Sequence, residues 1–134
     1  MNVRRQIIFH KHYFLDFYLG QPEKVQQKIE YAFKIIRNVE KVPKKFLDHV
    51  TGTDGLYEVR IEYESNIYRI FCCFDKGHLV ILFNGFQKKT QTTPKNLIDL
   101  ELKLKVEYFN LKDSDYLLHY SKCFLSESQT LYNF

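Results

Sequence analysis

The segment from Leu56 to Phe83 alternates apolar and polar residues and is interrupted twice by short turn sequences. Residues 56–63 and 67–74 show the two-residue period of β-strands, while residues 79–83 form a short, wholly apolar run. The turns lie at residues 64–66 and 75–77, and a Gly-rich sequence at residues 51–55 precedes the first strand. This pattern predicts a three-stranded antiparallel meander.

The residues before the meander predict a strand and helical structure. Residues 5–10 are typical of a short strand, and an aromatic stretch follows at residues 13–18. Pro22 suits a first helical position, and the apolar residues beyond it repeat every three or four positions up to about Val39. The stripe that should face the core is Val25, Ile29, Phe33 and Ile36. Residues 42–50 are expected to be a connector with one helical turn.

The residues after the meander predict a polar loop and a last helix. The loop spans residues 84–93, and Thr93 and Pro94 suit the cap and first residue of a helix. Its buried stripe should be Leu97, Leu100, Leu104 and Tyr108. The chain is therefore predicted to hold one α+β domain over residues 1–110, with a C-terminal extension over residues 111–134. The apolar residues of that extension are expected to pack against protein.

Composition narrows the class of protein. Hydrophobic residues make up 45% of the chain, which is enough for a core and argues against global disorder. The net charge is +4, and the surplus lies in residues 1–110 because the extension carries three acids against two lysines. A basic domain attracts phosphates, and salt should weaken that attraction.

The cysteines and the apolar runs predict a cytoplasmic protein. Cys72, Cys73 and Cys123 have no zinc-site spacing, and reduced thiols are expected, with Cys72 in the core. The apolar run near Met1 is too short for a signal peptide, and no run approaches the roughly 20 residues that cross a bilayer. No membrane association is expected.

Three motifs together resemble a known family of toxins. They are residues 56–60 (LYEVR), residues 68–71 (YRIF) and residues 84–94 (NGFQKKTQTTP). In order and spacing they resemble the phage-related HigB-like branch of the RelE/ParE toxin superfamily, from about Arg5 to Asn110. The resemblance implies a small sheet flanked by helices and ribosome-dependent cleavage of mRNA. It also implies a neighbouring antitoxin with a helix-turn-helix domain.

The residues suit metal-independent RNA cleavage, for which no cofactor is expected. The ribose 2′-OH attacks its own phosphate, so the protein must accept a proton and stabilise a crowded dianionic phosphorane. Arginine suits phosphate because its planar fork donates two hydrogen bonds and keeps its charge. Arg60 and Arg69 fall on adjacent predicted strands, and Lys88 and Lys89 follow the next one. Four cations are thus expected to converge on one phosphate, stabilising charge that develops in the transition state.

Each candidate also has a structural interpretation. Arg60 alternates with Glu58 and Glu62 and can pair with them on a solvated face. Arg69 lies between apolar neighbours and fits a buried pairing. The resemblance favours catalytic roles for Arg60, Arg69 and Lys88.

The groups that move protons stay open at this point. Glu58 is a candidate base, with orientation of Arg60 as its alternative role, and a lysine crowded by cations is a second candidate base. His49 precedes the Gly-rich turn and is expected to reach the substrate, together with Lys89 and Thr90.

Two other functions fit the same sequence. A ParE-like toxin would poison DNA gyrase instead of cutting RNA. A non-enzymatic module would use the same cations only to bind RNA or a protein. The predicted function is an endoribonuclease toxin whose partners are an antitoxin, mRNA and the ribosome.

Overall fold

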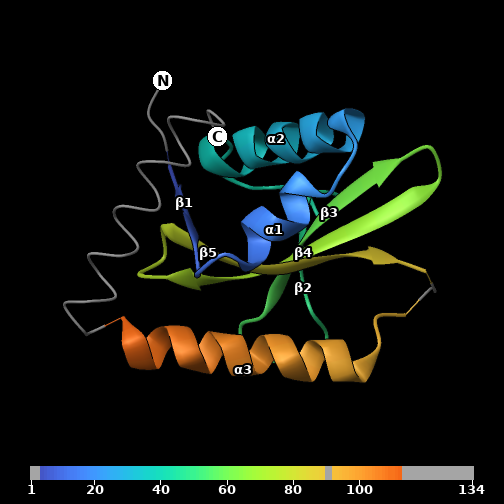
Figure 1. The fold of residues 1–134 in the computed structure, drawn as a ribbon. Helices are drawn as coiled ribbons and strands as arrows, with labels where there is room; N and C mark the ends of the chain where they lie inside the picture. The colour runs from blue at the N-terminus through green and yellow to red at the C-terminus, as the bar shows by residue number, and fades with distance from the viewer. Residues whose placement is uncertain (1–3, 90–91, 113–134) are drawn as a thin grey trace.

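The computed structural model describes residues 4–89 and 92–112, and the statements below concern those residues. They form three helices and five strands (Figure 1). In chain order these are β1 (Gln6–Phe9), α1 (Tyr13–Leu19), α2 (Glu23–Asn38), β2 (Leu47–His49), β3 (Tyr57–Tyr63), β4 (Asn66–Asp75), β5 (Leu79–Lys88) and α3 (Lys95–Leu111).

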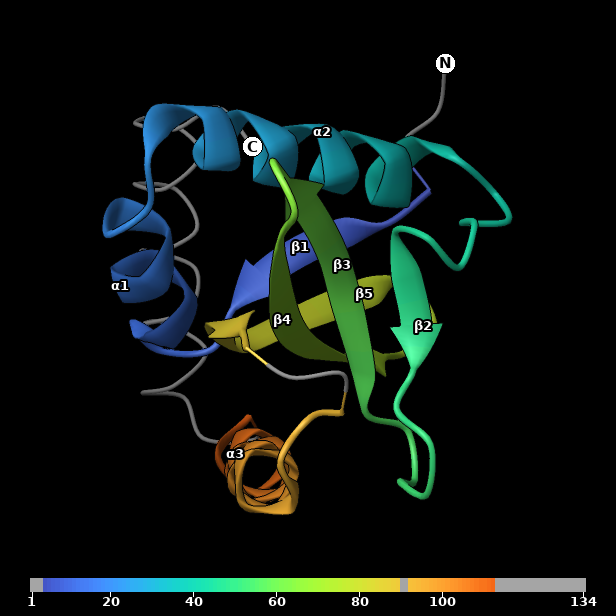
Figure 2. The same ribbon diagram turned by 90° about the vertical axis from the view of Figure 1, so that its right-hand side faces the viewer.

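The strands build one mixed sheet between two layers of helix. Its order is β1-β5-β4-β3-β2, in which β3, β4 and β5 are the predicted antiparallel meander. The N-terminal strand β1 pairs parallel with β5. Helices α1 and α2 lie on one face of the sheet and α3 lies across the other (Figures 1 and 2). The predicted α+β class is confirmed, and the arrangement is consistent with a RelE-like fold.

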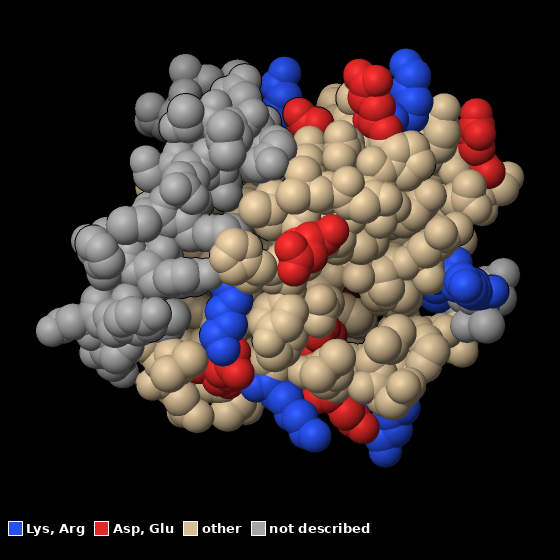
Figure 3. All heavy atoms as spheres, in the orientation of Figure 1, with Lys and Arg blue, Asp and Glu red and all other residues tan. Residues whose placement is uncertain are grey.

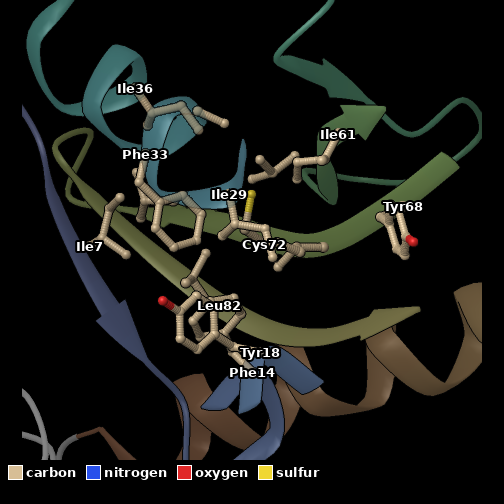
Figure 4. Close-up of a cluster of buried hydrophobic side chains, with 14 of the residues drawn as sticks. Ile7, Phe14, Tyr18, Ile29, Phe33, Ile36, Ile61, Tyr68, Cys72 and Leu82 are labelled. Carbon is tan, nitrogen blue, oxygen red and sulfur yellow. The ribbon is translucent and has the colours of Figure 1, made fainter. Parts of the chain in front are cut away.

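The larger core lies between the sheet and α1 and α2. All four residues of the predicted α2 stripe are buried in it, so the three-to-four-residue period identified the inner face of that helix correctly. Figure 4 shows Phe33 and Ile29 of α2 directed at Leu82 and Cys72 of the sheet. The prediction that Cys72 is a core residue is confirmed.

A second core lies between the sheet and α3. It contains Leu56, Phe71, Ile81 and Phe83 from the sheet side and Leu104 and Tyr108 from α3. The predicted buried stripe of α3 was wrong at Leu100, which is 44% exposed, and it omitted Glu101, which is buried. Glu101 is held by polar contacts, because its Oε1 accepts a hydrogen bond of 2.8 Å from the backbone N–H of Asn84. Burial raises the pKa of the Glu101 carboxyl.

Two further predictions about the sheet were wrong. Residues 47–49 form the edge strand β2 instead of a helical turn, because they pair with residues 57–59 of β3. The third strand of the meander continues to Lys88, so the first half of the predicted loop is strand. The sheet therefore has five strands where a meander and one N-terminal strand would give four.

Strand β5 contains a β-bulge that changes which side chains face α3. Ile70 of β4 pairs with Gly85, but Cys72 pairs with Leu82, so β5 has one extra residue at this point. Gly85 allows the backbone to pass α1 closely, since a Cβ there would lie 2.4 Å from the Phe17 ring.

The predicted boundary at residue 110 is not tested. Helix α3 ends at Leu111, and the predictions about the extension concern residues that lie outside the described part of the chain from residue 113 onward.

Candidate functional site

The sheet register brings the two candidate arginines together. Arg60 of β3 and Arg69 of β4 are direct cross-strand partners, so both side chains leave the same face. Glu58 lies two residues before Arg60 on β3 and therefore shares this face. It is the face covered by α3, with the second core at one end and these charged residues at the other.

The β5 bulge places Lys88 on this same face. Before the bulge Val80 and Leu82 face α1 and α2, so uninterrupted alternation would direct residue 88 that way too. The extra residue reverses the alternation, and Lys88 becomes the partner of Ile67, two residues from Arg69 on β4. Arg60, Arg69 and Lys88 thus share one face of the sheet, and Lys88 belongs to a strand and not to a loop. That these cations converge on one phosphate stays a prediction.

Glu58 lies between the two guanidinium groups. Its Oε1 is 3.5 Å from Arg69 Nε and 3.9 Å from Arg60 Nε. The Arg69 side chain is 2% exposed, and its Nη1 donates a hydrogen bond of 3.0 Å to the Tyr68 carbonyl. Burial lowers the pKa of the Arg69 guanidinium, while the carboxylate of Glu58 opposes that shift. Arg69 is therefore a buried cation held by Glu58.

Arg60 is the more accessible arginine. Its side chain is 33% exposed, and its Nη1 lies 3.9 Å from Asp48 Oδ2 of β2. The same Nη1 donates a hydrogen bond of 3.4 Å to the Lys44 carbonyl. The sequence prediction missed Asp48, because residues 42–50 were not expected to include a strand. Asp48 of β2 is the cross-strand partner of Glu58 of β3, so the Asp48 side chain lies on the same face.

An aromatic pair borders the charged residues. Phe71 and Phe86 are stacked with ring centroids 5.4 Å apart and an angle of 18° between the rings. Phe86 is the cross-strand partner of Arg69 and is only partly buried, whereas Phe71 is buried. A partly exposed ring beside cations is a surface on which a nucleic-acid base can stack. Phe86 lies within the motif NGFQKK, but the sequence did not single it out. Its place beside Arg69 follows from the continuation of β5 through this motif.

The structure does not bring His49 to this face. His49 pairs with Tyr57 on the opposite face, where the two rings lie 5.2 Å apart. Its predicted approach to the substrate therefore lacks geometric support. Lys89 follows the end of β5 and is exposed. Thr90 lies outside the described residues.

A separate polar network connects α3 to β1 and β4. His10 is buried, and its Nε2 and the Lys11 ammonium each lie 2.8 Å from Oε1 of Glu107. Burial lowers the pKa of His10. Tyr108 donates a hydrogen bond of 2.8 Å to Asp75, to which the Lys112 ammonium also donates. These contacts join the last turns of α3 to the sheet side of the molecule and involve neither Arg60 nor Arg69.

Surface charge is mixed on the side of the molecule seen in Figure 3. Its described residues show lysine and arginine interspersed with aspartate and glutamate, around a broad uncharged area. This side therefore shows no extended basic patch among those residues. The group formed by Glu58, Arg60 and Arg69 is identified by strand pairing and by the distances between its charged atoms.

The described residues hold neither a metal-binding cluster nor a membrane-spanning helix. They contain no group of three histidine, cysteine, aspartate or glutamate side chains placed to hold a metal ion. None of their helices combines the length and the apolar character needed to cross a membrane.

Comparison with known proteins gives a family. The model of the family described as "Phage derived protein Gp49-like (DUF891)" matches residues 16–105, about two thirds of the chain. This range contains Glu58, Arg60, Arg69 and Lys88. No curated protein matches the chain. The fold, the matched range and the residues within it lead to one conclusion: the chain belongs to the Gp49-like family of phage-derived proteins, a toxin-like family of the RelE/toxin-type superfamily.

Proposed function

We propose that this protein is the toxin of a type II toxin-antitoxin system, of the HigB-like kind, and that it cleaves mRNA on the ribosome. Membership of a toxin-like family supports the toxin role in general. The observation that carries the nuclease is the group formed by Glu58, Arg60, Arg69 and Lys88 on one sheet face, next to the partly exposed ring of Phe86. A carboxylate, several cations and a stacking surface are the components that RNA cleavage without a metal needs.

In the proposed reaction Glu58 accepts the proton of the ribose 2′-OH. The freed oxygen forms a bond to the adjacent phosphorus, and the bond from phosphorus to the 5′ oxygen breaks as that oxygen takes a proton from solvent. The products are a 2′,3′-cyclic phosphate and a 5′-hydroxyl end. Arg60 and Lys88 stabilise the negative charge that grows on the phosphate oxygens.

Arg69 has a supporting role in this scheme. Its guanidinium is buried and lies 3.5 Å from Glu58, so it holds the carboxylate toward the phosphate site. Phe86 stacks on a base next to the scissile bond and fixes the register of the RNA.

The family implies an antitoxin as partner. A helix-turn-helix antitoxin is proposed here, with an acidic or amphipathic segment that covers the face holding Arg60 and Arg69. Binding should be tight and should weaken with salt, because charged groups on both sides lose attraction as ions screen them. Since the proposed substrate is translated mRNA, the protein acts in the cytoplasm.

Induction of the protein without its antitoxin tests the proposal. Growth should stop and full-length mRNA should disappear, with new 5′ ends inside translated messages. An Arg60→Ala version expressed to the same level is the control and should leave mRNA intact. If messages stay whole while gyrase-dependent DNA breaks accumulate, the protein is a ParE-like toxin. If growth continues and purified protein still binds RNA, it is a non-enzymatic binding module.

A further inference from the structure

Strand β3 is longer than the edge strand that covers it. β2 pairs with residues 57–59 only, and the Arg60 N–H makes one more hydrogen bond, of 2.8 Å, to the Phe46 carbonyl. The chain then turns away, because the N–H groups of Phe46 and Leu47 both donate to the Pro43 carbonyl. Figure 2 shows β3 continuing past β2 toward α2. The end of β3 therefore has an open edge.

The backbone of Glu62 points to that open edge. Successive residues of a strand direct their N–H and C=O groups to opposite neighbours, and Arg60 directs its N–H toward β2. Glu62, two residues later, shares that direction, whereas Ile61 and Tyr63 alternate with it toward β4. Within the described residues no strand pairs with Glu62 on the β2 side. An open edge of this kind accepts an additional extended segment.

A groove runs beside this edge. It has a volume of about 350 Å³ and lies between α2, the segment before β2, and β3. Ala32 and Ile61 are buried apolar residues at its base, and the Tyr31 ring, 55% exposed, lies 5.9 Å from the ring of Phe46. A side chain of an added strand would find apolar contacts there, as alternate side chains do in strand addition.

The charges around the groove select the occupant. Lys28, Lys45, Arg60 and Glu62 are the charged residues that line it, and Arg60 is already paired with Asp48 and Glu58. The Lys45 ammonium is held over the Phe46 ring at 5.1 Å from its centroid. Lys28 and Lys45 thus remain to favour an acidic ligand. They disfavour a second copy of this chain, since symmetric edge pairing would bring Lys28 and Lys45 of one copy toward the same lysines of the other.

We propose that the edge of β3 at Glu62 and the adjoining groove bind an extended acidic segment of a partner protein, which adds a strand next to β3. Backbone hydrogen bonds to Glu62 give the register, an apolar side chain occupies the space between Tyr31 and Phe46, and acidic side chains pair with Lys28 and Lys45. This surface adjoins the candidate site at Arg60, but the proposal does not depend on RNA cleavage.

The test uses a displayed library of random nonapeptides selected against the full-length protein. Enriched peptides should carry apolar residues at alternate positions and an excess of Asp and Glu. A labelled copy of the most enriched peptide then serves as the probe in fluorescence anisotropy. Enrichment of basic peptides, or no enrichment over an empty surface, would overturn the proposal.

Variants locate the binding. Glu62→Pro removes the outward N–H without touching the ladder to β4, and it should weaken the probe at least tenfold. Glu62→Ala keeps that N–H and is the matched control, which should bind as well as the original protein or better. Lys28→Glu and Lys45→Glu should each weaken binding about tenfold, a change of roughly 1.4 kcal/mol. Lys103→Glu, an exposed position on α3 across the sheet, should have no effect.

Two measurements keep the result decisive. If Glu62→Pro does not fold, as judged by circular dichroism, Tyr31→Ser takes its place, because that ring is exposed and its loss leaves the core intact. Sedimentation of the protein alone tests the competing occupant. A dimer that Glu62→Pro converts to a monomer would assign the edge to a second copy and overturn the proposed partner.

Discussion

Arg69 of β4 is a buried guanidinium whose nearest carboxylate is that of Glu58 on β3, with 3.5 Å between Nε and Oε1. Direct cross-strand pairing of Arg69 with Arg60 adds a second cation beside the same carboxylate. A buried charge needs its partner more than an exposed one does, because water cannot replace the lost contact. The same carboxylate thus serves the stability of the sheet and the proposed chemistry.

Replacement of Glu58 should therefore destabilise the protein. Glu58→Ala leaves the Arg69 charge buried without its partner, which should lower the free energy of unfolding by about 3 kcal/mol. Glu62→Ala, an exposed acid on the same strand, should change it by less than about 0.5 kcal/mol. Urea denaturation measures both. The double variant Glu58→Ala with Arg69→Met should recover part of the lost free energy of unfolding. If Glu58→Ala and Glu62→Ala are equally stable, the ion-pair role of Glu58 is contradicted.

Arg60 should matter for activity more than for stability. Arg60→Ala removes a cation that is one third exposed, so the free energy of unfolding should change by less than about 1 kcal/mol. Loss of a transition-state contact should slow RNA cleavage roughly a hundred- to a thousandfold. Lys103→Ala on α3 is the control with equal loss of charge. Cleavage that survives Arg60→Ala unchanged would remove Arg60 from the proposed mechanism.

Phe86 should contribute to RNA binding through its ring. Phe86→Leu keeps an apolar side chain against Phe71 but loses stacking on a base, which is worth about 1–3 kcal/mol. Affinity for a short single-stranded RNA should fall by roughly five- to a hundredfold, as read by filter binding. Phe109→Leu makes the same chemical change on α3, and it should leave affinity unchanged.

Protonation of His10 should destabilise the fold. Burial lowers the folded-state pKa of His10 below its ordinary value of 6.5, so the unfolded chain binds a proton more readily. The stability that His10 contributes is thus complete above pH 6.5 and is lost as the pH falls from there toward the folded-state pKa. Denaturant titrations at about pH 7.5 and about pH 5.5 should show the decline. His10→Gln, which can still donate to Glu107, should show a smaller decline over this range.

The sequence predicted the meander and α2 well because their patterns are local. Alternation placed Val59 and Ile61 on one face and Glu58 and Arg60 on the other, and both placements are confirmed. The parallel pairing of β1 with β5 joins residues far apart in the chain, so no local pattern could reveal it.

The residue types of the candidate site could be predicted from the sequence, but the burial of those residues could not. Residue types and spacing identified Arg60 and Arg69 and left a buried pairing open for Arg69, but they did not show that α3 covers this face of the sheet. That helix begins more than twenty positions after Arg69 in the chain, so no local pattern could reveal its position. Asp48 and Phe86 were missed for a related reason. Both belong to strands that form only because distant residues of the sheet pair with them.

The extra residue in β5 acts as a change of phase within one strand. Positions up to Phe83 belong to the core, whereas Phe86 and Lys88 reach the charged face only because one residue has been added before them. Deleting Asn84 would keep Phe86 and Lys88 in the chain but would turn both side chains toward α1. Among relatives of this chain, therefore, the number of residues between Phe83 and Phe86 carries as much information about function as the identity of Lys88 itself.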